Sequence, residues 1–382
     1  MKQIDIFIWV LSLTGCIGNA NSPVRDSEGI HIMWNPNSMR QLADKGTYPR
    51  LLRLKDNSIM VVFENLAGSI VFKRSDNDGL SWSEATEVFS RFIYTDKKGN
   101  SIPVNTANPE IIQLSNGHII LGCNYRPVQE EMAPYSIVIR RSTDNGKTWL
   151  PPQILYNAAP RFRDGCWEPS FLELPDGELQ LYFANETPYQ HSDEQEISML
   201  TSPDAGESWT SKPKTISFRE NKRDGMPVAA IVGDEIVVVI EDNKSVGFKP
   251  YTVRTKLRDN WKIPVEAYSP NREYALSETI PDSVYLGAPY LLKLPTGETL
   301  ISYQSNENRS SNWEYSVMEV AIGDKTARNF SRRTQPFKVP LNKSAKWNSI
   351  ALWNDSTVVA LTSSDFNSEA IAPWMMIGHI KF

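Results

Sequence analysis

A pattern repeated six times at nearly constant intervals constrains this chain more than any other feature. Each copy has two apolar runs joined by a turn near Asp-Gly or Asn-Gly, as in EPSFLELPDGELQLYFANE at 168–186. The copies begin at Pro49, Pro109, Pro169, Pro227, Pro289 and Ser349, so successive starts are almost evenly spaced. The apolar runs predict β-hairpins, and the regular period predicts repeats rather than the separate domains that 382 residues would otherwise suggest.

A shorter motif recurs as SDNDGLSW at 75–82, RSTDNGKTW at 141–149 and SPDAGESW at 202–209. Its Ser and Asp side chains can accept backbone N–H groups, its Gly supplies a positive φ, and its Trp anchors the turn. An EF-hand calcium loop is disfavoured because the six-ligand pattern is absent. The motif lies beyond the first hairpin of its repeat, so it joins a second pair of strands. Four strands in each of six repeats predict an all-β fold, a six-bladed β-propeller.

The last repeat contains one strand too few at its end. The segment from Ile371 to Phe382 can form its third strand, and the segment from Gly29 to Asn35 can add the fourth from the N-terminus. The propeller domain is therefore expected to cover residues 29–382.

The N-terminal segment, 1–15, holds an apolar run that is too short to span a bilayer. The run ends in LTGC, from Leu13 to Cys16, which resembles a bacterial lipoprotein signal. The resemblance implies a signal peptide at 1–15, a lipidated Cys16, and a polar tether at 16–28. It also implies membrane attachment through the lipid, in the periplasm or at the cell surface. A plain signal peptide is the alternative.

Composition narrows the range of partners. The net charge of −5 has mixed signs and no basic run, which argues against nucleic acid. Beyond Cys16 only Cys123 and Cys166 remain, too few for a disulfide framework, and the four His show no metal-ligand spacing. We expect a monomer that needs no metal or cofactor. The 11 Trp, 14 Tyr and 14 Phe suit both sheet packing and sugar stacking.

Hairpin geometry predicts which rim of the propeller carries function. The first strand starts, and the second strand ends, on one rim, whereas the Asp-Gly turns and the Trp motifs lie on the other. The functional rim is rich in carboxylates, amides and aromatic rings, as expected of a funnel that binds sugar. The predicted substrate-binding residues are Arg50, Asn108, Trp167, Asp224, Tyr285, Tyr290 and Trp347. Any of the aromatic residues could instead belong to the core.

Two carboxylates on this rim are candidates for catalysis. Glu168 opens the third repeat beside Trp167, and Glu241 ends the second strand of the fourth. A retaining glycosidase holds its two carboxyl groups roughly 5–5.5 Å apart, and an inverting one roughly 6.5–9.5 Å. Glu64 and Glu186 occupy comparable strand ends and are rivals, and either candidate could be an ordinary solvated charge.

The three Trp-containing turns resemble the Asp boxes of the sialidase superfamily, and the chain from about residue 40 fits that superfamily. It most resembles the exo-α-1,5-L-arabinanases of glycoside hydrolase family 93. The resemblance lies in YPRLLRL around Arg50 and in the segments 166–186 and 223–241. It implies a retaining exo-acting glycoside hydrolase that releases a small sugar from the non-reducing end of α-1,5-L-arabinan. It also implies that Glu168 is the acid/base and Glu241 the nucleophile.

Two other functions stay open. An exo-α-sialidase needs three arginines for the sialate carboxylate, an Asp acid, and a Tyr nucleophile paired with a Glu. Arg50 follows the pattern of the first arginine, but no matching motifs surround Arg126, Arg223, Arg272 and Arg309. A non-catalytic glycan-binding lipoprotein would bind sugar without turnover, whether or not either Glu is present.

Overall fold

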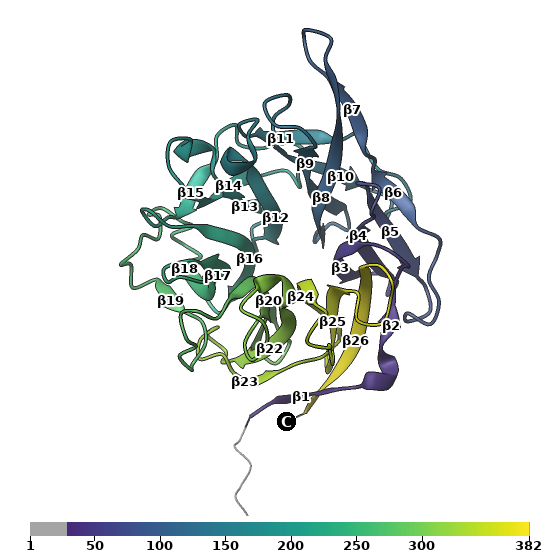
Figure 1. The fold of residues 1–382 in the computed structure, drawn as a ribbon, viewed down its shortest axis with the longest axis vertical. Coiled ribbons are helices and arrows are strands. Elements are labelled where there is room, and N and C mark those ends of the chain that lie inside the picture. The colour runs from purple at the N-terminus through teal and green to yellow at the C-terminus, as the bar shows by residue number, and fades with distance from the viewer. Residues whose placement is uncertain (1–28, 382) are drawn as a thin grey trace, which may run out of the picture.

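The computed structural model describes residues 29–381, and within them the chain forms six sheets arranged around a central axis (Figure 1). The all-β six-bladed propeller predicted from the repeats is therefore confirmed. The only helices in the described part are short 3-10 turns, and none is long or apolar enough to cross a membrane. The predicted signal peptide, tether and lipidated Cys16 fall outside the described residues.

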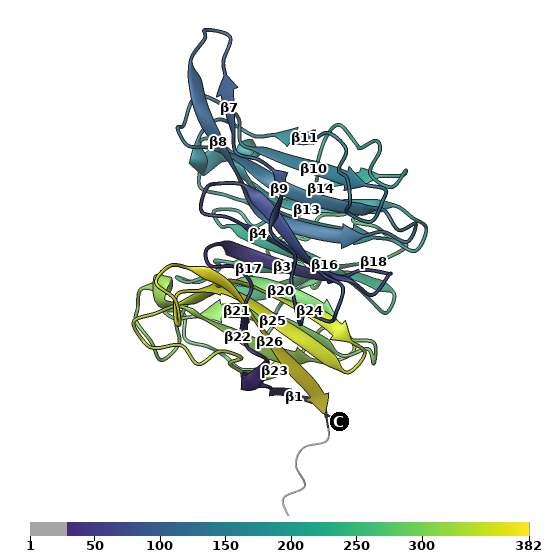
Figure 2. The ribbon, with the colours of Figure 1, turned by 90° about the vertical axis from the view of Figure 1, so that its right-hand side faces the viewer.

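In each blade the chain runs from the axis outward. Blade one comprises β3 (Thr47–Arg53), β4 (Ile59–Glu64), β5 (Ile70–Ser75) and β6 (Thr86–Phe89). Blade two comprises β8 (Ser101–Gln113), β9 (Ile119–Pro127), β10 (Ser136–Ser142) and β11 (Gln153–Asn157), with β7 (Phe92–Thr95) paired to the first part of β8. Blade three comprises β12 (Cys166–Glu173), β13 (Leu179–Asn185), β14 (Glu196–Ser202) and β15 (Lys214–Ser217). The hairpin of β7 and β8 projects beyond the body of the molecule (Figure 2).

The second half repeats the arrangement. Blade four comprises β16 (Asp224–Val232), β17 (Glu235–Asp242), β18 (Lys249–Lys256) and β19 (Arg272–Tyr274). Blade five comprises β20 (Leu286–Lys293), β21 (Thr299–Ser305), β22 (Val317–Gly323) and β23 (Ser331–Thr334). Blade six comprises β24 (Ala345–Asn354), β25 (Thr357–Ser364) and β26 (Ala372–Lys381), joined by β1 (His31–Trp34) and β2 (Arg40–Gln41).

The two ends of the described chain close the ring in blade six. β1 pairs antiparallel with β26, from His31 opposite Lys381 to Trp34 opposite Gly378. β26 also pairs along its length with β25, so it is the third strand and β1 the fourth. The predicted completion of the last repeat from the N-terminus is confirmed.

The apolar runs form the packing between blades. In β4 and β17 the residues from Ile59 to Phe63 and from Ile236 to Ile240 are at most 1% exposed. Successive strand residues point to opposite faces, so these strands are buried on both faces, each against a neighbouring blade. Cys123 and Cys166 are free thiols within this core.

The Trp-containing turns have the predicted hydrogen bonds. The Ser hydroxyl that begins each motif accepts the N–H of its glycine at 2.8 Å, for Gly79, Gly146 and Gly206 alike. These glycines have φ between 73° and 83°, which an L side chain rarely adopts. Gly206 lies against Ile120 of blade two. The Trp-containing turn of blade three therefore also packs against blade two.

A matched pair of glycine substitutions tests this packing. Gly206→Ala would place a Cβ 2.7 Å from Ile120 at a φ of 83°. Gly177→Ala meets the same backbone strain, at a φ of 89°, with no atom within 4 Å. We expect Gly177→Ala to lower the free energy of unfolding by about 1 kcal/mol and Gly206→Ala by about 2–3 kcal/mol, measured by urea denaturation. Equal losses would show that the contact with blade two adds nothing.

Candidate active site

One end of the central axis is covered by six residues that begin the innermost strands. At each start the strand register skips two residues, the first of which has a φ between 49° and 58°. These floor residues are Tyr48, Asn108, Glu168, Met226, Ala288 and Trp347. Tyr48, Met226, Ala288 and Trp347 pack together, so the floor residues converge. In blade six the register places Asn348 where the other blades have proline, one residue before the repeat start expected at Ser349.

A second set of residues holds the floor in place. The side chain at the end of a second strand accepts the backbone N–H of the floor residue in the next blade, at 2.5–2.9 Å. These clasp residues are Glu64, Asn124, Glu241, Gln304 and Ser363. In blade three the equivalent residue is Ala184, which has no acceptor, and the N–H of Met226 bonds to Glu168 instead. The clasp residues recur at a nearly constant offset from the floor residues of their own blades, a regularity that could have identified them from the sequence.

Glu168 is the only acidic floor residue, and it is partly exposed at the mouth. Burial, followed by the carboxylate of Glu241, raises its pKa to about 8 against the opposing charge of Arg126. The apolar character of the neighbouring floor residues explains the burial effect, because they offer little to solvate a charge.

Glu241 lies at the end of β17, next to the floor. Its Oε2 accepts the N–H of Ala288 at 2.8 Å. Burial raises its pKa to about 7 despite this hydrogen bond and the charge of Arg223, which both act to lower it. A Cβ at residue 225 would lie 3.1 Å from Glu241 Oε1 and from Gln195 Oε1, so Gly225 leaves the space that the carboxylate occupies. Glu168 therefore holds its proton at a pH where Glu241 has begun to lose its own.

The rival carboxylates have structural partners. Glu186 is 2% exposed, accepts the indole N–H of Trp167 at 2.9 Å, and forms an ion pair with Arg223. Glu64 accepts the N–H of Asn108 and the hydroxyl of Thr47. Glu186 thus fixes Trp167 beside Glu168, and Glu168 lies close enough to Glu241 for the charge of Glu241 to raise its pKa.

An aromatic wall stands beside the pair on blades five and six. Tyr285 accepts a hydrogen bond from Gln304 Nε2 at 3.0 Å, and burial together with the charges of Glu241 and Glu168 raises its pKa. Trp313 lies 5.6 Å from Tyr285 and 6.1 Å from Trp347, between ring centres, and is 39% exposed. The sequence did not point to Trp313, because it lies in a loop turn, η4 (Trp313–Tyr315), outside the repeat pattern.

Four predicted substrate-binding residues lie in the framework instead. Trp167 is 6% exposed, packs in the hydrophobic core and donates its indole N–H to Glu186. Arg50 is 4% exposed and forms an ion pair with Glu110 at 3.0 Å, and Tyr290 donates a hydrogen bond to the same Glu110 at 3.2 Å. Asp224 is fully buried and is bound by Arg272 and Ser217. Because these residues begin strands, the sequence predicted that they face the mouth of the propeller. In the structure, ion pairs and hydrogen bonds within the protein occupy their polar groups.

The five arginines considered for a sialate carboxylate do not form a cluster with free donors. Arg50 and Arg272 bind buried carboxylates, Arg223 binds Glu186 and Asp193, and Arg309 donates to backbone carbonyl groups. Among the five, and within residues 29–381, only Arg126 donates to no protein acceptor. Nor does this part of the chain hold three or more His, Cys, Asp or Glu side chains grouped as metal ligands.

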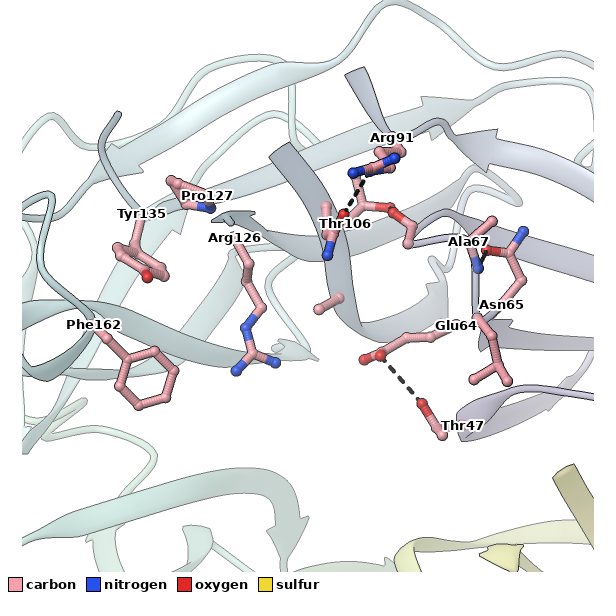
Figure 3. Close-up of a pocket in the computed structure, with 14 residues that line it drawn as sticks. Thr47, Glu64, Asn65, Ala67, Arg91, Thr106, Arg126, Pro127, Tyr135 and Phe162 are labelled. Carbon is pink, nitrogen blue, oxygen red and sulfur yellow. Dashed lines mark hydrogen bonds between the residues drawn. The ribbon is translucent and has the colours of Figure 1, made fainter. Parts of the chain in front are cut away.

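A cavity of about 650 Å³ lies over blades one and two (Figure 3). Its charged lining residues are Glu64, Arg91 and Arg126, and Tyr135 and Phe162 bound its far side. Glu168 does not line it, but the charge of Arg126 lowers the pKa of both Glu168 and Glu64, so Arg126 lies near both.

Comparisons with known proteins agree with this architecture. A family model described as a BNR repeat-like domain matches residues 129–239, and no curated protein sequence matches the chain. A Dyadobacter fermentans protein of unknown function is 15% identical, with a TM-score of 0.65 over 90% of this chain and 100% of that one. The GH93 α-L-arabinofuranosidase of Fusarium graminearum, in complex with arabinobiose, is 16% identical, with a TM-score of 0.64 over 89% and 97%.

A Hadza microbial sialidase is 14% identical, with a TM-score of 0.61 over 87% of this chain and 65% of that one. Identities this low carry the fold and not the activity. The chain is thus a six-bladed β-propeller in which residues 129–239 match a BNR repeat-like domain, and its fold resembles those of a GH93 arabinofuranosidase, an arabinanase and a sialidase.

Proposed function

We propose that this protein is a retaining exo-acting glycoside hydrolase that releases a small sugar from the non-reducing end of α-1,5-L-arabinan. The observation that carries the proposal is the pair of carboxyl groups at the mouth, with pKa values of about 8 for Glu168 and about 7 for Glu241. Retaining hydrolysis needs one protonated and one ionised carboxyl group at the same pH. Solved neighbours in this fold include an arabinofuranosidase and an arabinanase, each complexed with arabinobiose, which supports the choice of substrate.

In the first step Glu241 attacks the anomeric carbon and Glu168 donates its proton to the glycosidic oxygen. The bond between that carbon and oxygen breaks, the leaving sugar departs as an alcohol, and a glycosyl ester forms on Glu241. In the second step Glu168, now ionised, takes a proton from water. The water oxygen attacks the anomeric carbon, and Glu241 leaves as a carboxylate.

Local geometry suits these roles. The hydrogen bond from Ala288 holds Glu241 Oε2, which orients the carboxylate and leaves Oε1 for the sugar. Once Glu241 is esterified its negative charge is gone, so the pKa of Glu168 falls and Glu168 becomes a carboxylate able to act as base. Tyr285 and Trp347 are partly exposed and offer aromatic faces for sugar rings, whereas Trp167 is 6% exposed and packs in the core.

The arrangement of arginines favours this function over a sialidase. A sialate carboxylate needs several free guanidinium groups, and Arg50, Arg223 and Arg272 each bind a carboxylate of the protein itself. A neutral furanose needs no such cluster.

Product analysis on debranched arabinan, run beside a sialyl conjugate, tests the substrate. We expect a small arabinose-containing product from the chain ends and no release of sialic acid, as seen by chromatography with mass spectrometry. Release of sialic acid alone would move the protein to the sialidase reaction. Binding of arabinan without turnover, unchanged in Glu168 and Glu241 variants, would identify a binding protein.

Substitution of the pair tests the division of labour. Glu241→Ala removes the nucleophile and should abolish turnover of every α-linked substrate. Glu168→Ala should lose about 10²–10⁴-fold on arabinan but much less on an aryl arabinofuranoside, because a good leaving group needs little protonation. Azide should accelerate the deglycosylation step of Glu168→Ala.

Glu64→Gln and Glu186→Gln serve as controls for that experiment, because both remove a carboxylate from the same rim. The opposite pattern in the two main variants would exchange the roles of Glu168 and Glu241. Normal turnover in both would refute the pair and make Glu64 or Glu186 the next candidate.

The pKa values predict how activity depends on pH. Glu241 must be ionised, so kcat/KM should rise with pH through about 7, and Glu168 must be protonated, so it should fall above about 8. A bell-shaped profile on an aryl arabinofuranoside would show both limbs. Glu168→Gln cannot ionise, so its residual activity should keep the acidic limb and lose the alkaline one. An alkaline limb that persists in this variant would assign it to another group.

The location of the protein is a further proposal, based on the LTGC sequence at Leu13–Cys16. We propose that Cys16 carries lipid and holds the protein to a membrane of the periplasm or the cell surface. Cys16→Ser should move the protein from the membrane pellet to the soluble fraction of fractionated cells. A variant that stays with the membrane would contradict lipidation at this residue.

A further inference from the structure

The cavity over blades one and two has an arginine that the protein leaves without an acceptor. Arg126 lies near the end of β9, half-buried, with its guanidinium 5.1 Å from the centre of the Trp167 ring and 5.8 Å from that of Phe162. Within residues 29–381 the guanidinium of Arg126 donates no hydrogen bond and forms no ion pair. It points into the cavity (Figure 3). The aromatic faces fix the guanidinium while its five N–H donors stay available.

The acidic residue in the cavity, Glu64, interacts with the charge of Arg126, which acts to lower the pKa of Glu64, but it forms no ion pair with the guanidinium. Glu64 is engaged elsewhere, because its two oxygens accept the N–H of Asn108 and the hydroxyl of Thr47. A second cation lines the cavity: Arg91 donates through Nε to Asn105 at 3.0 Å. The other half-buried or buried arginines at the mouth, Arg50 and Arg223, bind carboxylates of the protein.

The cavity lies on the side of the mouth where a leaving group belongs. The acid of a glycosidase protonates the leaving oxygen, so the leaving sugar lies next to the acid and the nucleophile lies on the other side of the anomeric carbon. Arg126 is near Glu168, and Glu241 lies one blade further from the cavity, in blade four. A sugar held between the two carboxyl groups would therefore extend its leaving group toward Arg126.

We infer that the cavity is the leaving-group subsite and that it takes a sugar bearing a carboxylate, a uronic acid, through Arg126. A planar guanidinium matches a carboxylate with two parallel hydrogen bonds, which a neutral sugar hydroxyl cannot provide. The inference rests on the proposed glycosidase function. It extends that function: the preferred bond joins an arabinofuranosyl group to an acidic chain, and linear neutral arabinan is the poorer substrate.

Two synthetic disaccharides test the inference, each with the same α-L-arabinofuranosyl group. One is linked to the methyl glycoside of a hexuronic acid, and the other to the matching neutral hexose. We expect kcat/KM of the wild-type protein to be about 10- to 100-fold higher for the acidic substrate, as a charge-assisted hydrogen bond provides. In Arg126→Gln this ratio should fall to near one, and Arg126→Lys should restore part of it.

Arg91→Gln is the matched control, because it removes the same charge from the same cavity. A general effect of charge would lower the ratio equally in the Arg91 and Arg126 variants, and would overturn a specific contact with Arg126. A wild-type ratio near one, or a parallel loss on both substrates in Arg126→Gln, would also overturn the inference while leaving the glycosidase function intact.

A binding measurement tests the uronate subsite independently of the proposed hydrolysis. Turnover of debranched arabinan decides the assigned reaction. If the wild-type protein hydrolyses neither disaccharide, calorimetric titration of the uncleaved acidic disaccharide tests the subsite alone. Binding that is lost in Arg126→Gln supports the uronate site. Equal binding by both proteins, or no binding to the wild-type protein, overturns it. Circular dichroism melting curves for each variant ensure that a loss does not come from unfolding.

Discussion

The fold and the candidate site share one interaction, the hydrogen bond from the N–H of a floor residue to the clasp side chain of the preceding blade. A positive φ at a residue other than glycine costs about 1–3 kcal/mol, and the chain adopts it at all six floor positions. That backbone turns its N–H toward the neighbouring blade, where a side-chain oxygen accepts it at five of the six junctions. The same contact therefore closes the propeller and shapes its mouth.

The sixth junction differs, and the difference explains the position of Glu168. The clasp position of blade three is Ala184, so the N–H of Met226 would lack a side-chain acceptor from that strand. Glu168 takes over this role from the floor of its own blade. Its carboxyl group is thereby held across the junction toward blade four, where Glu241 ends its strand, so the missing clasp places the two carboxyl groups within electrostatic reach.

The sequence predicts the repeat well because its signal is local. The hairpins and the Ser and Gly of the Trp-containing turns follow from residues close together in the chain, and the missing fourth strand of the last repeat follows from counting strands in each repeat. The site is harder to predict because its selection depends on contacts across blades. Arg50, Tyr290 and Asp224 begin strands just as Glu168 does, and only their distant partners Glu110 and Arg272, on other blades or strands, remove them from the mouth. Trp313 lies outside the repeat positions, and Arg126 lies near the end of a second strand, where the sequence does not show whether its guanidinium has a partner.

The clasp positions hold both neutral and charged side chains, and this difference distinguishes residues that only support the fold from those that can also react. Asn124, Gln304 and Ser363 show that a neutral oxygen suffices to accept the floor N–H. A carboxylate at such a buried position costs solvation energy, so Glu241 and Glu64 exceed what the framework needs. Glu64 and Glu241 differ in the partner of the second carboxylate oxygen and in whether another carboxyl group lies nearby. Thr47 binds the second oxygen of Glu64, whereas Glu241 directs its own beside Gly225 and shares its field with Glu168. Of the two surplus charges, Glu241 is the one in a position to react.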